Sequence, residues 1–247
     1  IKVKGSWKNR HNHEEAASVV KLVKAIFKNR KKNESIGIVT FNIEQKEYIE
    51  DLLDFEADKY PTFRKQLYRE RNRIIDGENA SLFVKNLENA QGDERDIIIF
   101  SVGYAKNVYD RVVAQFGSLS IEGGENRLNV AITRAKKKVY VVTSIEPEEL
   151  DRIENTKNNG PKLLKKYLQY VRAVSDKKEK EIKYLLSTFD SRPKADEFCG
   201  AYEEQIKEEL EKLGYVVYTN LGNTDYKLSL GVYDPSLNRY VLGIECD

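Results

Sequence analysis

The spacing of apolar residues changes along the chain and predicts two kinds of element in its first part. Apolar residues recur every three to four positions over 13–29, which predicts an amphipathic helix with Asn12 as its N-cap. The run 35–40 (SIGIVT) and the amphipathic stretch 43–53 predict a strand followed by a helix. Three further apolar runs are typical of strands buried on both faces of a parallel sheet: 82–84, 97–102 and 139–143. Strands that alternate with helices predict a doubly wound α/β domain.

The pattern changes after residue 150. A loop, a helix and a charged connector follow in order, at 155–161, 161–174 and 175–195. The last predicted elements are a helix and two strands joined by a DPSLN turn, at 197–213, 226–233 and 239–246. We therefore expect an α/β domain, a helical connector and a small, truncated α/β unit, at 1–153, 154–195 and 196–247. The lack of an initiating Met indicates a piece of a longer protein.

Composition narrows the classes of protein that fit this pattern. With 40% hydrophobic and 33% charged residues, the 247-residue chain is typical of a soluble globular protein and has no membrane span. The formal net charge of +2 excludes a basic field over the whole surface, so any nucleic-acid surface must be local. Cys199 and Cys246 form no C-x-x-C pair, which argues against a zinc site and fits a reducing, cytoplasmic setting.

Basic and apolar residues combine in the segment 127–138, RLNVAITRAKKK, directly before a predicted strand. Arg127 and Arg134 are seven residues apart, so in a helix both guanidinium groups would emerge on one face. Such groups hold phosphate oxygens and stabilise the charge that develops during phosphoryl transfer. A solvated basic helix face gives the same pattern, so the segment alone leaves both interpretations open.

A polar segment, 86–96 (NLENAQGDERD), lies between two predicted strands. Gly92 allows a tight turn there, and loops at strand ends are where α/β sheets bind ligands. Gln91 carries an amide that suits a ribose, base or phosphate, and Glu94 carries a carboxylate that suits sugar hydroxyls or an Arg. An ordinary capped turn explains the same residues.

A second polar segment, 40–45 (TFNIEQ), follows the first predicted strand. Asn42 is suited to cap the next helix. Gln45 lies in the first turn of that helix, where it faces either a ligand or the solvent. Taken singly, each residue is explained by local structure alone.

Taken in order, these segments resemble motifs IV, V and VI of superfamily 1 helicases of the Upf/Dna2-like branch. The matching segments are 35–53, 82–102 and 123–143, the last with GENRLNVAITRAKKKVYVVT. The resemblance covers roughly residues 1–150. It implies the second of two RecA-like lobes, with ATP bound between the lobes and single-stranded nucleic acid crossing both.

The resemblance also implies roles for individual residues. Arg134 would contact the γ-phosphate, and Arg127 would support the same phosphate end or the lobe interface. Gln45 and Glu94 would help to hold the nucleotide beside the turn at Gly92. Gln91 would couple the nucleotide site to the strand site.

One element that ATP chemistry requires is absent from this sequence. No G-x-x-x-x-G-K-[ST] loop occurs in 1–247, so the phosphate cradle and the Mg²⁺-binding hydroxyl are expected upstream, in an N-terminal lobe of the same protein. This piece alone is therefore not expected to hydrolyse ATP.

Acidic residues mark the last fifty positions. Carboxylates at strand ends can hold Mg²⁺ and activate water for phosphodiester attack, although a small domain with solvated acids fits equally well. Residues 198–247 resemble the Vsr-like, restriction-endonuclease-fold domain found after some bacterial superfamily 1 helicases. Glu203, Glu245 and Asp247 fall on its acidic positions, which implies catalytic roles for all three and Mg²⁺ binding by Glu245 and Asp247.

The tail departs from that family at one position. Ser229 stands where the family usually has Asp, and a hydroxyl is a weaker metal ligand than a carboxylate. Three explanations remain open: a degenerate site, an inactivating change, or a register shifted onto Asp225. Cleavage by this tail is therefore an open question at the level of sequence.

The sequence favours the C-terminal part of an ATP-dependent helicase or translocase with an appended nuclease-like domain. DNA is favoured over RNA because the tail resembles DNA-cleaving domains. Two alternatives remain: a non-catalytic DNA-binding module, and a Mg²⁺-dependent DNA endonuclease positioned by a helicase-like lobe.

Overall fold

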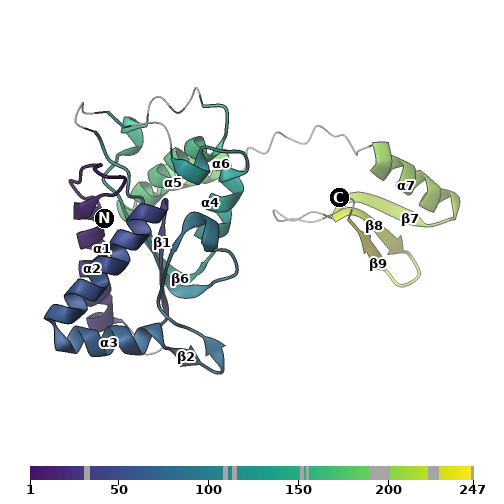
Figure 1. Ribbon diagram of the computed structural model, residues 1–247. Coiled ribbons are helices and arrows are strands. Elements are labelled where there is room, and N and C mark those ends of the chain that lie inside the picture. Colours follow the sequence, from purple (N-terminus) through teal and green to yellow (C-terminus); the bar gives the residue numbers. More distant parts are fainter. Residues whose placement is uncertain are drawn as a thin grey trace. The chain divides into compact units, whose positions relative to one another are not determined.

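The computed structural model describes most of the chain. The described residues are 1–30, 34–107, 111–112, 116–150, 153, 156–189, 201–221 and 228–245. The chain divides into two compact units, 1–186 and 187–247 (Figure 1). Within the described residues, no helix is long and apolar enough to cross a membrane.

A four-stranded sheet in the order β4-β1-β5-β6 forms the centre of the first unit (Figure 1). Its strands are β1 (Ile36–Thr40), β4 (Phe83–Asn86), β5 (Arg95–Ser101) and β6 (Ala135–Val142). Every neighbouring pair in this sheet is parallel. Each residue of β1 is buried, as expected of a strand covered on both faces. The predicted α/β fold with a parallel sheet is confirmed.

Helices flank this sheet. Those that contribute to its two cores are α1 (His13–Asn29), α2 (Ile43–Lys59), α3 (Pro61–Arg71), α4 (Gly124–Ile132) and α5 (Gly160–Ser175), and α6 (Glu179–Phe189) follows them in the chain. Single 3-10 turns also occur: η1 (Leu87–Asn89), η2 (Gly117–Leu119) and η3 (Pro147–Glu149). Asn12 and Asn42 cap α1 and α2, because their side chains accept from the backbone N–H groups of Glu15 and Gln45. Both predicted caps are confirmed.

A small hairpin was not expected from the pattern. The strands β2 (Ile74–Ile75) and β3 (Glu78–Asn79) pair antiparallel around Asp76 and Gly77, which both have positive φ. An Asp-Gly pair is a strong hairpin signal in sequence. The flanking strands are only two residues each, which is too short to show an alternation of apolar and polar residues.

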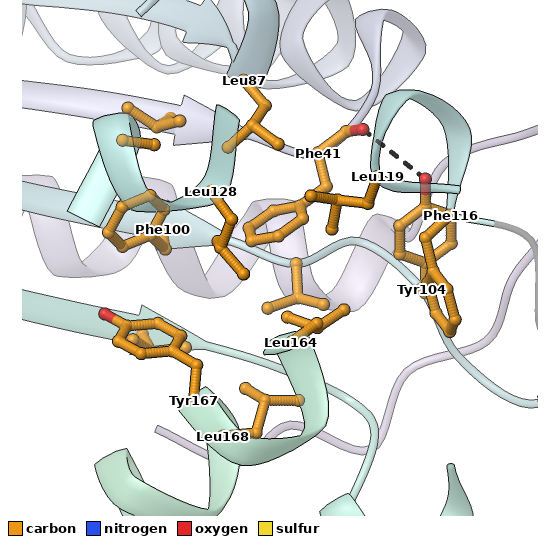
Figure 2. Packing of buried hydrophobic residues seen from close by; sticks show 14 of the residues in the cluster. Phe41, Leu87, Phe100, Tyr104, Phe116, Leu119, Leu128, Leu164, Tyr167 and Leu168 are labelled. Atoms are coloured by element: carbon orange, nitrogen blue, oxygen red, sulfur yellow. Dashed lines mark hydrogen bonds between the residues drawn. The ribbon is translucent and has the colours of Figure 1, made fainter. Parts of the chain in front are cut away.

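The two faces of the sheet bury separate cores. Along β5, Ile97 and Ile99 face one core, whereas Ile98 and Phe100 face the other, as the two-residue repeat of a strand requires. Helices α1, α2 and α3 cover the first core. Helices α4 and α5 cover the second, where Tyr167 of α5 makes an edge contact with Phe100, with ring centroids 6.2 Å apart (Figure 2).

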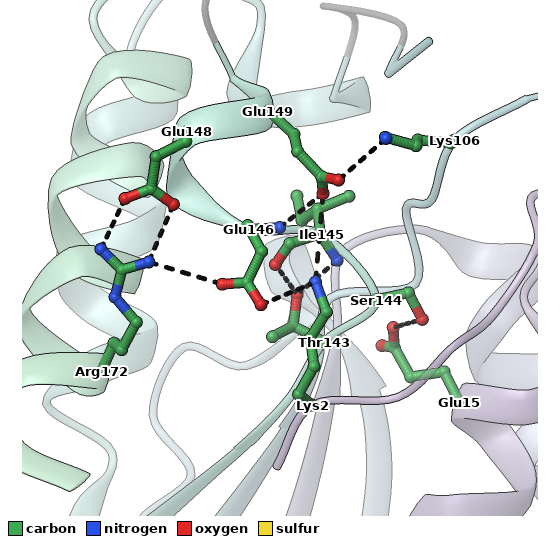
Figure 3. A network of polar contacts seen from close by, with 10 residues as sticks. All are labelled: Lys2, Glu15, Lys106, Thr143, Ser144, Ile145, Glu146, Glu148, Glu149 and Arg172. Carbon is green, nitrogen blue, oxygen red and sulfur yellow. Dashed lines mark hydrogen bonds and ion pairs between the residues drawn. The ribbon is translucent and has the colours of Figure 1, made fainter. Parts of the chain in front are cut away.

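Helix α5 lies within the span assigned to a connector, 154–195, yet it belongs to the core of the first unit. Leu164 is fully buried there, and Tyr167 and Leu168 are nearly so. Arg172 adds a bidentate ion pair with Glu148, with bonds of 2.8 and 2.5 Å (Figure 3). The apolar side of this helix is therefore a packing surface of the first unit.

The described part of the second unit contains helix α7 and an antiparallel sheet in the order β7-β8-β9. Its elements are α7 (Ala201–Lys212), β7 (Val216–Leu221), β8 (Leu228–Asp234) and β9 (Arg239–Ile244). Val217, Leu230 and Val232 form a small core against Ile206 and Leu210 of α7. The predicted helix and the two predicted strands are confirmed within the described residues.

Candidate functional site

The loop that precedes β5 lies at the amino edge of the parallel sheet. Gly92 has a φ of 83°, a left-handed conformation that favours glycine and permits the tight turn. Glu94 follows it, and its half-exposed carboxylate lies 3.8 Å from Arg134 Nη1 and 3.5 Å from Lys136 Nζ. Gln91 is exposed, and its side chain makes no hydrogen bond within the described residues. An amide, a carboxylate and two cations thus gather at this edge.

Arg134 is held at the same edge by backbone and side-chain bonds. The N–H of Arg95 donates to the Arg134 carbonyl at 3.0 Å, which joins the amino ends of β5 and β6. The guanidinium donates from Nε to the Val130 carbonyl at 2.8 Å and from Nη2 to Thr133 Oγ1 at 3.0 Å. Its Nη1 therefore remains beside Glu94, in position to contact an anion.

Arg127 contacts a different part of the chain. Its Nη1 donates to the carbonyls of Glu122, at 3.0 Å, and Ser118, at 3.4 Å. Helix α4 ends at Ile132, so Arg134 lies in the turn before β6 and not on the helix. The seven-residue spacing therefore does not place both guanidinium groups on one helix face, because β6 takes up the chain from residue 135.

Gln45 lies at the opposite, carboxyl edge of the sheet. It is fully buried: Oε1 accepts from the Asn12 N–H at 2.8 Å, and Nε2 donates to Ser101 Oγ at 3.1 Å. Ser101 ends β5 and Glu94 precedes its start, so these contacts are about 20 Å apart at about 3.3 Å per residue. The structure does not bring Gln45 together with Arg134 and Glu94.

A buried carboxyl group completes the polar cluster around Gln45. Glu15 accepts from the Gly103 N–H at 2.6 Å and from Ser101 Oγ at 3.0 Å. It also accepts from Ser144 Oγ at 3.1 Å (Figure 3). Within the described residues it has no ion pair with Lys or Arg. Burial raises the pKa of Glu15 from 4.5 to about 7, while these hydrogen bonds oppose the rise. We refer to Asn12, Glu15, Gln45, Ser101 and Ser144 as the buried acid network.

The acidic residues of the second unit lie on separate elements. Glu203 is on α7, Ser229 is on β8, and Glu245 directly follows β9; each has an interaction partner. Asp247 and Asp225 lie outside the described residues. The described part of the chain contains no group of three or more His, Cys, Asp or Glu residues that could hold a metal ion. The magnesium site therefore stays a prediction.

The chain matches a known family over the parallel sheet and the loops at both edges of that sheet. Residues 2–146 match the AAA domain family, which is more than half of the chain. The chain belongs to the AAA domain family. The matched span of this AAA domain includes β1, β4, β5 and β6, and with them Arg134, Glu94 and Gln45.

Three relatives extend this comparison. The AAA domain chain is 40% identical over 182 residues, 74% of its length, to the uncharacterized ATP-dependent helicase MG140 of Mycoplasma genitalium. It is 35% identical over 235 residues, 94% of its length, to the MG140 homolog of Mycoplasma pneumoniae. It is 25% identical over 139 residues, 49% of its length, to helicase sen1 of Schizosaccharomyces pombe. The chain spans 15%, 20% and 8% of these proteins, respectively.

Sequence reasoning did not find the buried acid network. Asn12 was recognised only as a cap, and Glu15 was not assigned a role. Ser101 lies near the end of the apolar run 97–102 and Ser144 follows the run 139–143, which is the one signal available: polar residues at strand ends tend to meet at one edge of a parallel sheet. Lys136, the second cation beside Glu94, was included in a basic segment without a role of its own.

Proposed function

We propose that this chain is the second RecA-like lobe of an ATP-dependent superfamily 1 helicase or translocase that acts on single-stranded nucleic acid, DNA in preference to RNA. The observation that carries the proposal is the guanidinium of Arg134, fixed at the amino edge of the sheet beside Glu94 and Lys136. The family and the ATP-dependent helicases named among its relatives support it. The activity belongs to the longer protein, of which this chain is a part.

The donor set at this edge suits a nucleoside triphosphate. Arg134 offers a planar fork and Lys136 a point charge for phosphate oxygens, and Glu94 offers an acceptor for sugar hydroxyls. ATP with its Mg²⁺ would supply the transferable phosphoryl group when bound. Gln91 lies on the exposed side of the same turn, where it can contact the nucleotide or the facing lobe.

Each residue of this chain then has a defined task. Glu94 keeps Arg134 near the edge in the absence of phosphate, and Val130 and Thr133 fix the direction of its guanidinium. Arg134 stabilises negative charge as it develops on the phosphoryl oxygens. Arg127 braces the start of α4 through the Ser118 and Glu122 carbonyls, which supports the surface that meets the partner lobe. That partner lobe must supply the phosphate-binding loop.

Replacement of Arg134 by Ala tests the proposal in the full-length protein. Strand-stimulated ATP turnover should fall by about 10³-fold or more, because the arginine that stabilises the transition state is lost. The affinity for single-stranded DNA and RNA, measured by fluorescence anisotropy, should stay within about threefold of the unsubstituted protein, because the strand does not contact this edge.

A matched control is Arg64→Ala, an exposed arginine on α3 that pairs with Asp58 and donates to the carbonyls of Ala57 and Asp58. Its turnover should equal that of the unsubstituted protein. Turnover that is unchanged in Arg134→Ala would rule out the arginine assignment. A protein that binds strand without any turnover would instead favour the DNA-binding module.

A further inference from the structure

A cavity of about 290 Å³ opens at the carboxyl edge of the sheet, on the side away from Arg134. Asn42 follows β1, Tyr104 follows β5, and Trp7 comes from the segment before α1; all three line it. The cavity lies wholly within the first unit. Its volume is at the small end of ligand pockets, about 300–1,000 Å³.

The cavity lies at the point where the strand order of the sheet reverses. From β1 the chain passes to β4 on one side, and from β5 it passes to β6 on the other. Helix α2, which follows β1, covers one face of the sheet, whereas α4, which follows β5, covers the opposite face. The connections that leave β1 and β5 therefore diverge, and open α/β sheets bind ligands in the crevice formed at such a point.

Two aromatic rings form a wall of this cavity. The centroids of Trp7 and Tyr104 are 5.0 Å apart, with their planes tilted by 34°. Tyr104 is fixed from behind by an edge contact with Phe116 and by its hydroxyl, which donates to the Phe41 carbonyl at 3.5 Å (Figure 2). Trp7 is half-buried, so a part of its indole remains accessible. A rigid ring behind an accessible indole suits the stacking of a flat aromatic ligand.

Polar groups surround the aromatic wall. Asn42 Oδ1 accepts from the Gln45 N–H at 2.7 Å, which fixes the amide plane. Asn42 Nδ2 is buried and has no hydrogen-bond acceptor among the described residues. At the mouth, Arg10 lies 2.9 Å from Glu44 with most of its side chain exposed. The cavity is thus lined by a fixed amide, with the ion pair of Arg10 and Glu44 at its rim.

We propose that this cavity binds one unpaired base of a single-stranded nucleic acid, stacked on Trp7, with Asn42 beside the base and Arg10 contacting the adjoining phosphate. Lys8 and Arg111 are exposed beside Trp7 and Val112 of the lining, which favours a polyanionic strand over a free nucleotide. The inference deepens the proposed function and rests on it, since it requires that a strand crosses this lobe. It places the base contact at the opposite edge of the sheet from Arg134.

The chain contains a single tryptophan, so its emission reports on this cavity directly. We would titrate the 247-residue chain with a twelve-nucleotide deoxythymidylate strand and, separately, a uridylate strand. Emission of Trp7 should be quenched and should saturate at the concentrations at which the anisotropy of a labelled strand rises. An abasic strand of equal length should raise anisotropy without quenching. Thymidine monophosphate should quench only at far higher concentration; quenching by it at equal concentration would overturn the choice of a strand.

Substitutions of Trp7 distinguish the loss of base stacking from a loss of folding. Trp7→Leu keeps apolar bulk and should weaken strand binding roughly 5- to 150-fold, the usual effect of losing one base–aromatic stack, whereas Trp7→Phe should keep most of the affinity. Arg64→Gln, an exposed cation on α3, is the control and should bind as the unsubstituted chain does. Circular dichroism and melting show whether each variant is folded. If Trp7→Leu does not fold, the quenching of the unsubstituted chain decides.

Two results would overturn the inference. The first is strand binding, measured by anisotropy, that leaves Trp7 emission constant or that is equally tight in a folded Trp7→Leu chain. The proposed helicase function would survive this result. The other is the absence of any strand binding, which would also remove strand contact from this lobe. The ATP turnover of Arg134→Ala is measured independently, so the two proposals can fail separately.

Discussion

At the level of single residues, Glu15 is a carboxyl group buried among neutral donors. The Gly103 N–H and the hydroxyls of Ser101 and Ser144 donate to it, and no Lys or Arg is ion-paired with it in the described chain. Its pKa is raised from 4.5 to about 7 by burial. Between these two values the folded chain keeps the proton, whereas the unfolded chain releases it.

This difference in proton binding determines how the free energy of unfolding depends on pH. The unfolded state binds fewer protons than the folded state between pH 4.5 and about 7, so the free energy of unfolding should fall as the pH rises through that interval. The loss attributable to Glu15 is about 3 kcal/mol. In Glu15→Gln this loss should be absent, and urea unfolding at pH 5 and pH 8 measures it.

Glu14→Gln provides the control for that measurement. Glu14 is an exposed carboxylate on the same turn, and its replacement should leave the pH dependence as in the unsubstituted chain. Equal pH dependence in Glu15→Gln and the unsubstituted chain would show that Glu15 is ionised in the folded state.

The sequence selected some candidate site residues but did not predict their contacts, because those contacts join distant positions. Glu94 and Arg134 stand next to predicted strands in polar or basic segments, so local pattern was enough to select them. Gln45 was selected in the same way, but its contacts with Asn12 and Ser101 bury it. Those contacts join residues 33 and 56 positions apart, and one sequence carries no record of such pairings.

At the level of elements, α5 shows how an amphipathic helix can be recognised before its partner is known. The sequence places apolar residues on one side of 161–174, but it does not say which surface they meet. In the structure that surface is the face of the sheet covered by α4. The loop between the strands and this helix contains Asn158, whose Nδ2 donates to the Ser120 carbonyl at 2.8 Å and so helps to bring α5 back onto the sheet.

Leu164→Ala tests this packing. Leu164 is fully buried, so its truncation should lower the free energy of unfolding of the first unit by about 2–5 kcal/mol. Val174→Ala on the same helix removes an exposed side chain and should cost about 0.5 kcal/mol or less. Urea unfolding followed by Trp7 emission measures both. Equal, small losses would show that α5 is not part of this core.

At the level of the whole molecule, each unit has its own core. The cores on the two faces of the parallel sheet contain only residues of the first unit, and the core of Val217, Leu230 and Val232 belongs to the second. The sequence predicted a change of texture near residue 150. The compact units divide later, at 186, because the apolar side of α5 packs on the first unit.

Because each unit has a core of its own among the described residues, we expect the first unit to keep its stability without the second. A chain that ends at Phe189, with α6 intact, should unfold within about 0.5 kcal/mol of the first unit in the full chain. Trp7 emission follows this unit in both chains, since the tryptophan lies within it. A loss of several kcal/mol in the shorter chain would show that the second unit stabilises the first.

The buried acid network also sets an order of events during synthesis. The hydrogen bond from Ser144 to Glu15 joins positions 129 apart, and the bond from Gly103 joins positions 88 apart. On the ribosome α1 emerges before the rest of this unit, but the carboxyl group of Glu15 cannot reach these donors until the last strand of the sheet has been made. Until then the nascent helix holds its apolar side, with Val19 and Val23, without a finished sheet to cover it. Among the helices of this unit, α1 is therefore made first and is among the last to be fixed in place.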